Sequence, residues 1–93
     1  MIWLPEALED IERLHDFLKE KSPQAAARAA KAIVDGARIL EGAPEAGRPM
    51  NDETERRELF VRFGAGAYVL RYRLDAAGTV VVIRVWHSRE ERV

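Results

Sequence analysis

The sequence has no cysteine and only two histidines and two serines among its 93 residues. The absence of cysteine excludes a disulfide scaffold, thiol catalysis and a thiolate zinc site. His15 and His87 are too few for a metal site without a defined carboxylate pattern, and no motif for nucleotide binding is present. The expectation is therefore a protein without metal or cofactor.

Long apolar runs are also missing. The longest stretches without a charge, residues 63–70 and 76–83, are eight residues each, whereas a membrane-spanning helix needs about 20. The first six residues lack the basic region and apolar run of a signal peptide. Because apolar residues make up 47% of the chain, enough for one core, we expect a single cytoplasmic domain over residues 1–93.

Lysine is absent after Lys31, and this absence accompanies a division of charge along the chain. Residues 1–55 hold seven basic and twelve acidic residues, whereas residues 56–93 hold eight arginines and four acidic residues. Arginine is suited to bidentate pairing with carboxylate or phosphate. The second part is therefore expected to present a face to an anionic partner.

Two segments, 5–21 and 23–41, have the periodicity of helices. Ser22 and Pro23 are typical of a helix start, and Gly36 is expected where the two helices cross closely. Asp10 is assigned to an outer face of the first helix. The expected inner face of that helix consists of Leu4, Leu8, Ile11, Leu14, His15 and Leu18.

From residue 57 onward the apolar period changes from 3.6 to 2, which predicts strands over 59–63, 68–74 and 79–86 joined by glycine-containing turns. Residues 2–4 are expected to form a short strand, of open position in the sheet, and residues 43–55 a loop. The predicted fold class is α+β in the order β-α-α-β-β-β, an antiparallel sheet with an N-terminal helical hairpin packed on one face.

The alternation also assigns the strand residues to two faces. The expected core face consists of Leu59, Val61, Phe63, Tyr68, Leu70, Tyr72, Leu74, Val81, Ile83 and Val85. The opposite face then gathers Phe60, Arg62, Val69, Arg71, Arg73, Val82, Arg84 and Trp86. Four arginines interleaved with two aromatic residues are an unusual composition for a solvent-facing sheet surface.

Three interpretations of this arginine face remain open. The arginines could hold RNA phosphate while His87, at the mouth, acts as acid or base. They could instead receive carboxylates of a protein segment, with Phe60 and Trp86 as hydrophobic anchors. They could also be solvated charges that pair with Glu58 or Asp75.

Several short motifs resemble the RelE/ParE superfamily of bacterial toxins. They are the GRP loop at residues 47–49, residues 57–59 (REL), the YVLRYR strand at 68–73 and the IRVWHSR ending at 83–89. The resemblance covers almost the whole chain. It implies the toxin of a type II toxin–antitoxin pair, in a hetero-oligomer with a cognate antitoxin that covers its functional surface.

The superfamily resemblance implies one of two targets. RelE-type members cleave mRNA on the ribosome, and for that activity Arg62, Arg84 and His87 would be catalytic. ParE-type members inhibit DNA gyrase by contact. The absence of lysine after Lys31 makes the chain more similar to ParE, so gyrase inhibition is the expected function, with mRNA cleavage or a degenerate partner-binding module as alternatives. The expected antitoxin- or target-binding residues are Phe60, Arg62, Arg71, Arg73, Arg84, Trp86 and Arg89.

Overall fold

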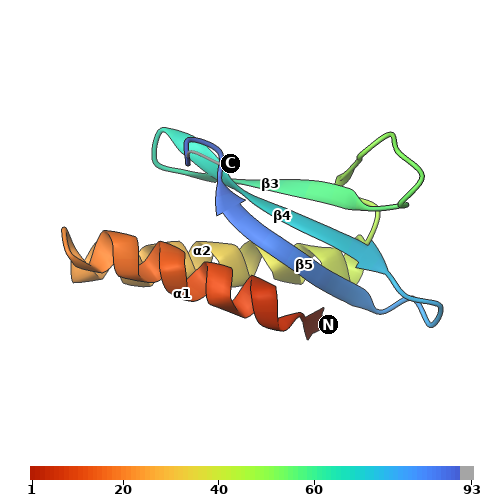
Figure 1. The fold of residues 1–93 in the computed structure, drawn as a ribbon, viewed down its shortest axis with the longest axis horizontal. Coiled ribbons are helices and arrows are strands. Elements are labelled where there is room, and N and C mark those ends of the chain that lie inside the picture. Colours follow the sequence, from red (N-terminus) through yellow and green to blue (C-terminus); the bar gives the residue numbers. More distant parts are fainter. Residues whose placement is uncertain (91–93) are drawn as a thin grey trace.

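The structure, a computed structural model, describes residues 1–90. Its elements are β1 (Ile2–Trp3), α1 (Pro5–Lys19), α2 (Pro23–Gly42), β2 (Arg48–Pro49), β3 (Arg57–Phe63), β4 (Gly66–Leu74) and β5 (Val80–His87). All five strands form one sheet in the order β1-β5-β4-β3-β2, and both helices lie on one of its faces (Figure 1). The predicted α+β class and helical hairpin are confirmed.

The sheet differs from the prediction at its two edges. β1 runs parallel to β5, with Ile2 opposite Val81, so the sheet is mixed and not wholly antiparallel. At the other edge β2 pairs with β3 through Arg48 and Glu58, within the segment predicted as a loop. Two-residue strands are too short to show a period of two, which is why the sequence pattern did not reveal this pairing.

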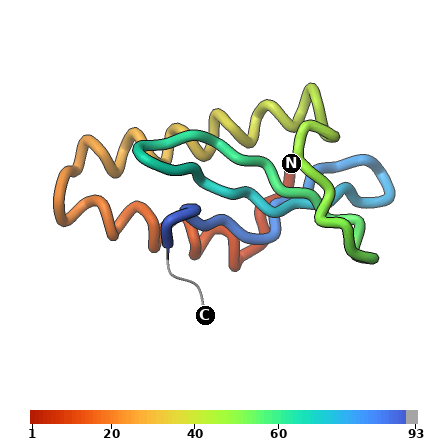
Figure 2. The backbone as a smooth tube through the Cα atoms, turned by 90° about the horizontal axis from the view of Figure 1, so that it is seen from above, coloured from red at the N-terminus to blue at the C-terminus, as the bar shows by residue number. Residues whose placement is uncertain are grey.

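In the helical hairpin, α2 begins where the sequence predicts, whereas the buried residues of α1 differ slightly from those predicted. Ser22 caps α2, since its Oγ accepts a hydrogen bond of 3.1 Å from the Ala25 amide. In α1 the buried residues are Ala7, Asp10 and Leu14, whereas Leu8, expected inside, is 54% exposed. Seen from above, the sheet lies over the two helices, with α2 along one side and α1 beneath β5 (Figure 2). Within residues 1–90 no helix has the length and apolar character needed to cross a membrane.

A β-bulge in β5 changes which side chains reach the core. The pairing with β4 passes from Arg71–Arg84 to Tyr72–Val82, which leaves Ile83 as an extra residue. Val85 lies in the core as predicted, but beyond the bulge Val80 and Val82 replace Val81 and Ile83 there, so the assignment of Val81 and Ile83 to the core face is wrong. Leu74, also expected inside, is 37% exposed at the end of β4. The rest of the strand side of the core is as predicted: Leu59, Val61, Phe63, Tyr68, Leu70 and Tyr72.

Gly36 lies against the sheet and not at a helix–helix crossing as predicted. It is buried in α2, and a Cβ at this position would lie 2.4 Å from Cγ2 of Val61 in β3. The absence of a side chain therefore allows α2 to approach β3 directly.

Replacement of Gly36 by leucine is expected to destabilise the fold by about 1–3 kcal/mol, because a β-branched valine cannot move aside easily. Thermal or urea unfolding measures this loss. The double variant with Val61→Ala should lose less than the sum of the two single variants, since the second change removes the methyl group that clashes. Additive losses would contradict the close approach of α2 to β3.

The buried hydroxyl of Tyr72 anchors the segment between α2 and β2. It donates a hydrogen bond of 2.6 Å to the carbonyl of Pro44 and accepts one of 2.9 Å from the Gly47 amide. Tyr72 itself is fully buried. Both hydrogen-bonding functions of this phenol are therefore satisfied within the chain, which positions β2 at the sheet edge.

Candidate functional site

The sheet face opposite the helices carries a band of aromatic and basic side chains. Across three strands Phe60 lies opposite Val69, and Val69 lies opposite Trp86. Val69 is only 2% exposed, whereas Phe60 is 46% exposed. No helix covers this face in the part of the chain that the structure describes (Figure 1). We define the open-face patch as Arg48, Phe60, Arg62, Val69, Arg71 and Trp86.

Two arginines of the open-face patch stack on its two aromatic rings. The Arg71 guanidinium carbon lies 4.9 Å from the centroid of the Trp86 ring, and that of Arg48 lies 4.9 Å from the centroid of the Phe60 ring. Such cation–π pairs hold both partners in place. Arg71 also donates two hydrogen bonds to one oxygen of Glu58, at 2.8 and 3.1 Å.

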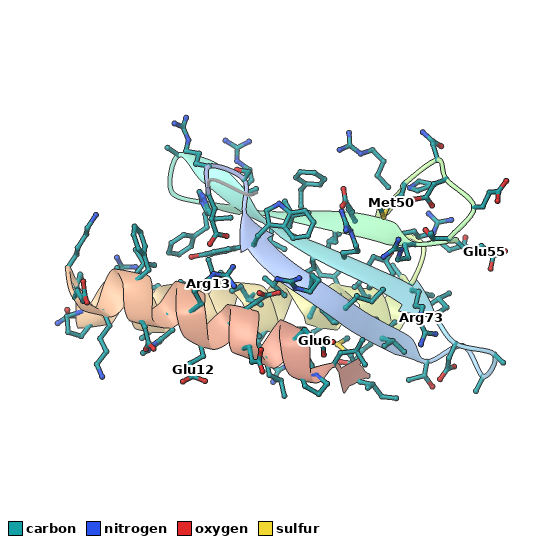
Figure 3. All side chains as sticks on the ribbon, in the orientation of Figure 1. Glu6, Glu12, Arg13, Met50, Glu55 and Arg73 are labelled. Atoms are coloured by element: carbon teal, nitrogen blue, oxygen red, sulfur yellow. The ribbon has the colours of Figure 1, made fainter. Side chains whose placement is uncertain are left out.

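The charge on this face is therefore only partly neutralised. Glu58 pairs with Arg71, as expected from the interpretation of the arginines as solvated charges. Among residues 1–90, no carboxylate forms an ion pair with Arg48, Arg62 or Arg73. Arg73 is exposed and lies toward the β4–β5 turn (Figure 3). The open-face patch thus offers two rigid aromatic anchors among free positive charges.

Arg84 does not join the other arginines of the open face. Its guanidinium binds Asp10 of α1 through two hydrogen bonds, of 2.7 and 3.0 Å, one to each carboxylate oxygen. The assignment of Asp10 to an outer helix face is wrong, because Asp10 is 2% exposed and lies between α1 and β5. Arg84 therefore ties β5 to α1.

The carboxylate of Asp10 also completes the outer edge of β5 beyond β1. It accepts a hydrogen bond of 2.9 Å from the Val85 amide and another from Arg13. Figure 3 shows Arg13 on the side of α1 toward β5, whereas Glu12 projects away from the sheet. Burial by itself raises the pKa of Asp10, but the hydrogen bonds from Arg84, Val85 and Arg13 outweigh it and hold the pKa below its usual value.

His87 lies at the end of β5 with both ring nitrogens engaged. Nδ1 accepts a hydrogen bond of 3.2 Å from the Arg89 amide, and Nε2 lies 3.3 Å from the carbonyl oxygen of Phe63. These contacts fit the tautomer with hydrogen on Nε2. The ring also packs edge-on against Tyr68, with centroids 5.1 Å apart.

The remaining predicted residue, Arg89, lies at the tip of the sheet. Its Nε donates a hydrogen bond of 3.2 Å to the Ala65 carbonyl in the β3–β4 turn. The expected site residues thus separate into three groups: Phe60, Arg62, Arg71, Arg73 and Trp86 on the open face, Arg84 against α1, and His87 with Arg89 at the tip. Within residues 1–90 no group of three or more acidic or histidine side chains could hold a metal ion.

Two residues of this region were missed by sequence reasoning. Arg48 belongs to the open-face patch through its contact with Phe60, and the GRP loop was its only signal. Asp10 organises Arg84 and Arg13, and its spacing from Ala7 and Leu14, three and four residues, is that of a buried helix stripe. A polar residue within such a stripe is the signal that was overlooked.

Comparisons with known proteins agree with this architecture. Residues 1–92 match the family described as "ParE toxin of type II toxin-antitoxin system, parDE". Two relatives from Caulobacter vibrioides are named Toxin RelE1 and Toxin RelE3. The first is 41% identical over 86 residues, covering 92% of this chain and 89% of the relative. The second is 40% identical over 90 residues, covering 95% and 92%.

A solved structure from the chromosomal ParDE toxin–antitoxin system of P. aeruginosa has the same fold. Its TM-score is 0.73 at 18% identity, with 91% of this chain and 90% of that chain covered. The family match spans nearly all of the sequence, and the two relatives are 41% and 40% identical to this chain over most of their own length. The chain belongs to the ParE family of toxins of type II toxin–antitoxin systems.

Proposed function

We propose that this toxin inhibits DNA gyrase by direct protein contact through the open-face patch, and that a cognate antitoxin neutralises it by covering the same surface in a hetero-oligomer. The stacked Arg48–Phe60 and Arg71–Trp86 pairs support such contact. Aromatic residues and arginines that are already held in place lose little side-chain entropy on binding. The unpaired Arg62 and Arg73 favour a partner segment that carries carboxylates.

The geometry of the candidate catalytic residues supports a contact mechanism over RNA cleavage. A general base needs a free ring nitrogen within reach of the reacting hydroxyl. Both nitrogens of His87 contact backbone groups, and the Arg84 guanidinium is bound by Asp10. Of the three residues considered for cleavage, only Arg62 is exposed without an ion-pair partner among residues 1–90. This observation carries the proposal.

Ribosome-dependent mRNA cleavage is the second candidate, because both curated relatives are named RelE toxins. In that case His87 would have to leave its two backbone contacts, and Arg84 would have to act while bound to Asp10. RNA cleavage therefore requires His87 and Arg84 to take part in the reaction, whereas inhibition of gyrase by contact does not.

Replacement of His87 by alanine separates these candidates. Under the proposal, the protein produces gyrase-dependent DNA cleavage and no codon-linked cutting of mRNA on ribosomes. The variant should then change gyrase inhibition only as far as it changes folding or binding, because no proton transfer is required of the toxin. The measurement is DNA cleavage by purified gyrase beside mRNA cleavage on purified ribosomes.

The matched control is His15→Ala, which removes the other histidine, on α1 beside Asp16. Thermal unfolding and antitoxin affinity show whether each variant is folded. If folded His87→Ala lost ribosomal mRNA cleavage by about 10²–10⁴-fold with its antitoxin affinity intact, the protein would be a nuclease that uses this imidazole.

A further inference from the structure

A pocket lies on the helix side of the sheet, between the C-terminal half of α1 and the tip where β3 turns into β4. Its volume is about 650 Å³, which is within the range of sites for small organic ligands. It is separate from the open-face patch, with which it shares no residue. Its apolar walls are formed by Leu14, Phe17 and Leu18 of α1 and by Phe63, Tyr68 and His87 of the sheet.

One polar group that lines this pocket has no hydrogen-bond partner within residues 1–90. Tyr68 is 2% exposed, and its ring packs between Phe63 and His87, with centroids 5.2 and 5.1 Å away. No residue in the range 1–90 forms a hydrogen bond with its hydroxyl, whereas the hydroxyl of Tyr72 forms two hydrogen bonds. The hydroxyl is not one of the buried side-chain atoms without a partner, so it is accessible from the pocket. The pocket therefore offers a ligand one hydrogen-bond donor that no residue in the range 1–90 uses.

The phenol of Tyr68 is a donor at neutral pH. Burial, with a smaller contribution from the negative charge of Glu90, raises its pKa above the ordinary value near 10. The proton therefore stays on the oxygen. A ligand that satisfies this hydroxyl must supply an acceptor atom.

The charges around the pocket favour an acceptor that is negative. Glu90 is already bound by two nitrogens of Arg13, at 3.0 and 3.1 Å, and by the His87 amide at 3.2 Å. Arg89 also lines the pocket, and no carboxylate among the described residues pairs with it. Among the described residues, the lining thus has an unpaired cation, Arg89, and a donor without a partner, the Tyr68 hydroxyl. The Glu90 carboxylate already has its hydrogen-bond partners.

We propose that this pocket binds a small organic acid with an aromatic or branched apolar body and one carboxylate. The apolar body contacts Phe17, Leu18 and Phe63, while the carboxylate accepts hydrogen bonds from the Tyr68 hydroxyl and the free guanidinium nitrogens of Arg89. Because Phe17 is 63% exposed at the rim, the ligand can enter without unfolding of α1. The inference does not depend on whether the toxin acts on gyrase or on mRNA.

The test is an NMR titration of the purified full chain with 4-phenylbutyrate, its neutral amide 4-phenylbutyramide, and butyrate. The acid should bind saturably, with shifts at the pocket residues, and about 10-fold more tightly than the amide, since a hydrogen bond to a charged group accounts for a factor of this size. It should also bind more tightly than butyrate, because butyrate lacks the phenyl ring that contacts the apolar walls. Tyr68→Phe and Arg89→Gln should each weaken binding of the acid about 10-fold. Arg28→Gln, which removes an exposed arginine of α2, is the matched control and should have no effect.

The stability of Tyr68→Phe provides an independent readout. Because the hydroxyl has no partner within residues 1–90, its removal should leave the melting temperature unchanged or higher, whereas Tyr72→Phe should lower it. Equal binding of acid and amide would overturn the proposal in favour of unspecific apolar contact. A lower melting temperature of Tyr68→Phe would overturn it as well. The proposal would also be overturned if the pocket bound none of the acids and were shielded from solvent only in the complex with the antitoxin. Its occupant would then be a protein segment.

Discussion

Replacement of Asp10 by alanine is expected to lower the free energy of unfolding by about 3 kcal/mol, the lower end of the range for breaking a buried ion pair. The lower end applies because the side chains of Arg84 and Arg13 are 42% and 45% exposed and can be hydrated once Asp10 is removed. The Val85 amide, in contrast, loses its acceptor at a buried strand edge. Urea unfolding measures the difference.

The exposed residue Asp35 provides the control for this experiment. It pairs with Lys31 one turn away on the surface of α2, so Asp35→Ala should leave the melting temperature unchanged. If Asp10→Ala were no less stable than Asp35→Ala, the carboxylate would not connect α1 to β5 as described.

The pH dependence of stability follows from the lowered pKa of Asp10. A group whose pKa is depressed in the folded state stabilises the protein fully above its unfolded pKa, which is about 3.9 for aspartate. That contribution is lost as the pH falls through the lower folded pKa. The stability difference between the native chain and Asp10→Asn should therefore be constant above about pH 4–5 and shrink in more acidic solution.

Trp86→Ala is expected to weaken the complex with the cognate antitoxin by about 2–4 kcal/mol, which corresponds to at least about 30-fold in Kd. The indole supports the Arg71 guanidinium on one side and lies opposite Val69 in the sheet. Its removal eliminates an aromatic anchor and leaves the Arg71 guanidinium without the ring on which it stacks, although Glu58 still binds it. Titration calorimetry with purified antitoxin gives the affinity directly.

The control for Trp86 is Ile39→Ala, because Ile39 is a large apolar residue of α2 that is 56% exposed on the helical side of the molecule. Both variants are first tested for folding by circular dichroism. A folded Trp86→Ala protein that binds antitoxin with undiminished affinity would remove the open-face patch from the proposed interface. Trp86→Phe, which retains a smaller ring, should fall between the native chain and alanine.

The sequence pattern was sufficient for both helices and for every strand except β2. Ser22 and Pro23 mark the start of α2 because they cap and preform its first turn. The period of two along residues 57–74 places Phe60, Arg62, Arg71 and Arg73 on the face away from the helices, because every second side chain of a strand shares a face. These short-range rules depend only on neighbours along the chain.

The sequence pattern failed where two distant segments meet. A single extra residue, Ile83, shifts the pairing of β5 with β4, and a shift of one residue exchanges the faces of a strand. For that reason Val80 and Val82 lie in the core in place of Val81 and Ile83. Periodicity cannot reveal a bulge, because the apolar run from residue 80 to 83 fits either face.

The candidate site divides in the same way. The amino-acid sequence by itself determined the toxin superfamily, the order of the helices and of every strand except β2, and the basic, aromatic character of one sheet face. Only the tertiary structure decided that Arg84 binds the buried Asp10, that both nitrogens of His87 contact backbone groups, and that the hydroxyl of Tyr68 is left without a partner among residues 1–90. The physical reason is that these interactions join groups far apart in the chain, 74 residues for Asp10 and Arg84 and 24 residues for Phe63 and His87. The packing of α1 against β5 sets the first distance, and the pairing of β3, β4 and β5 sets the second.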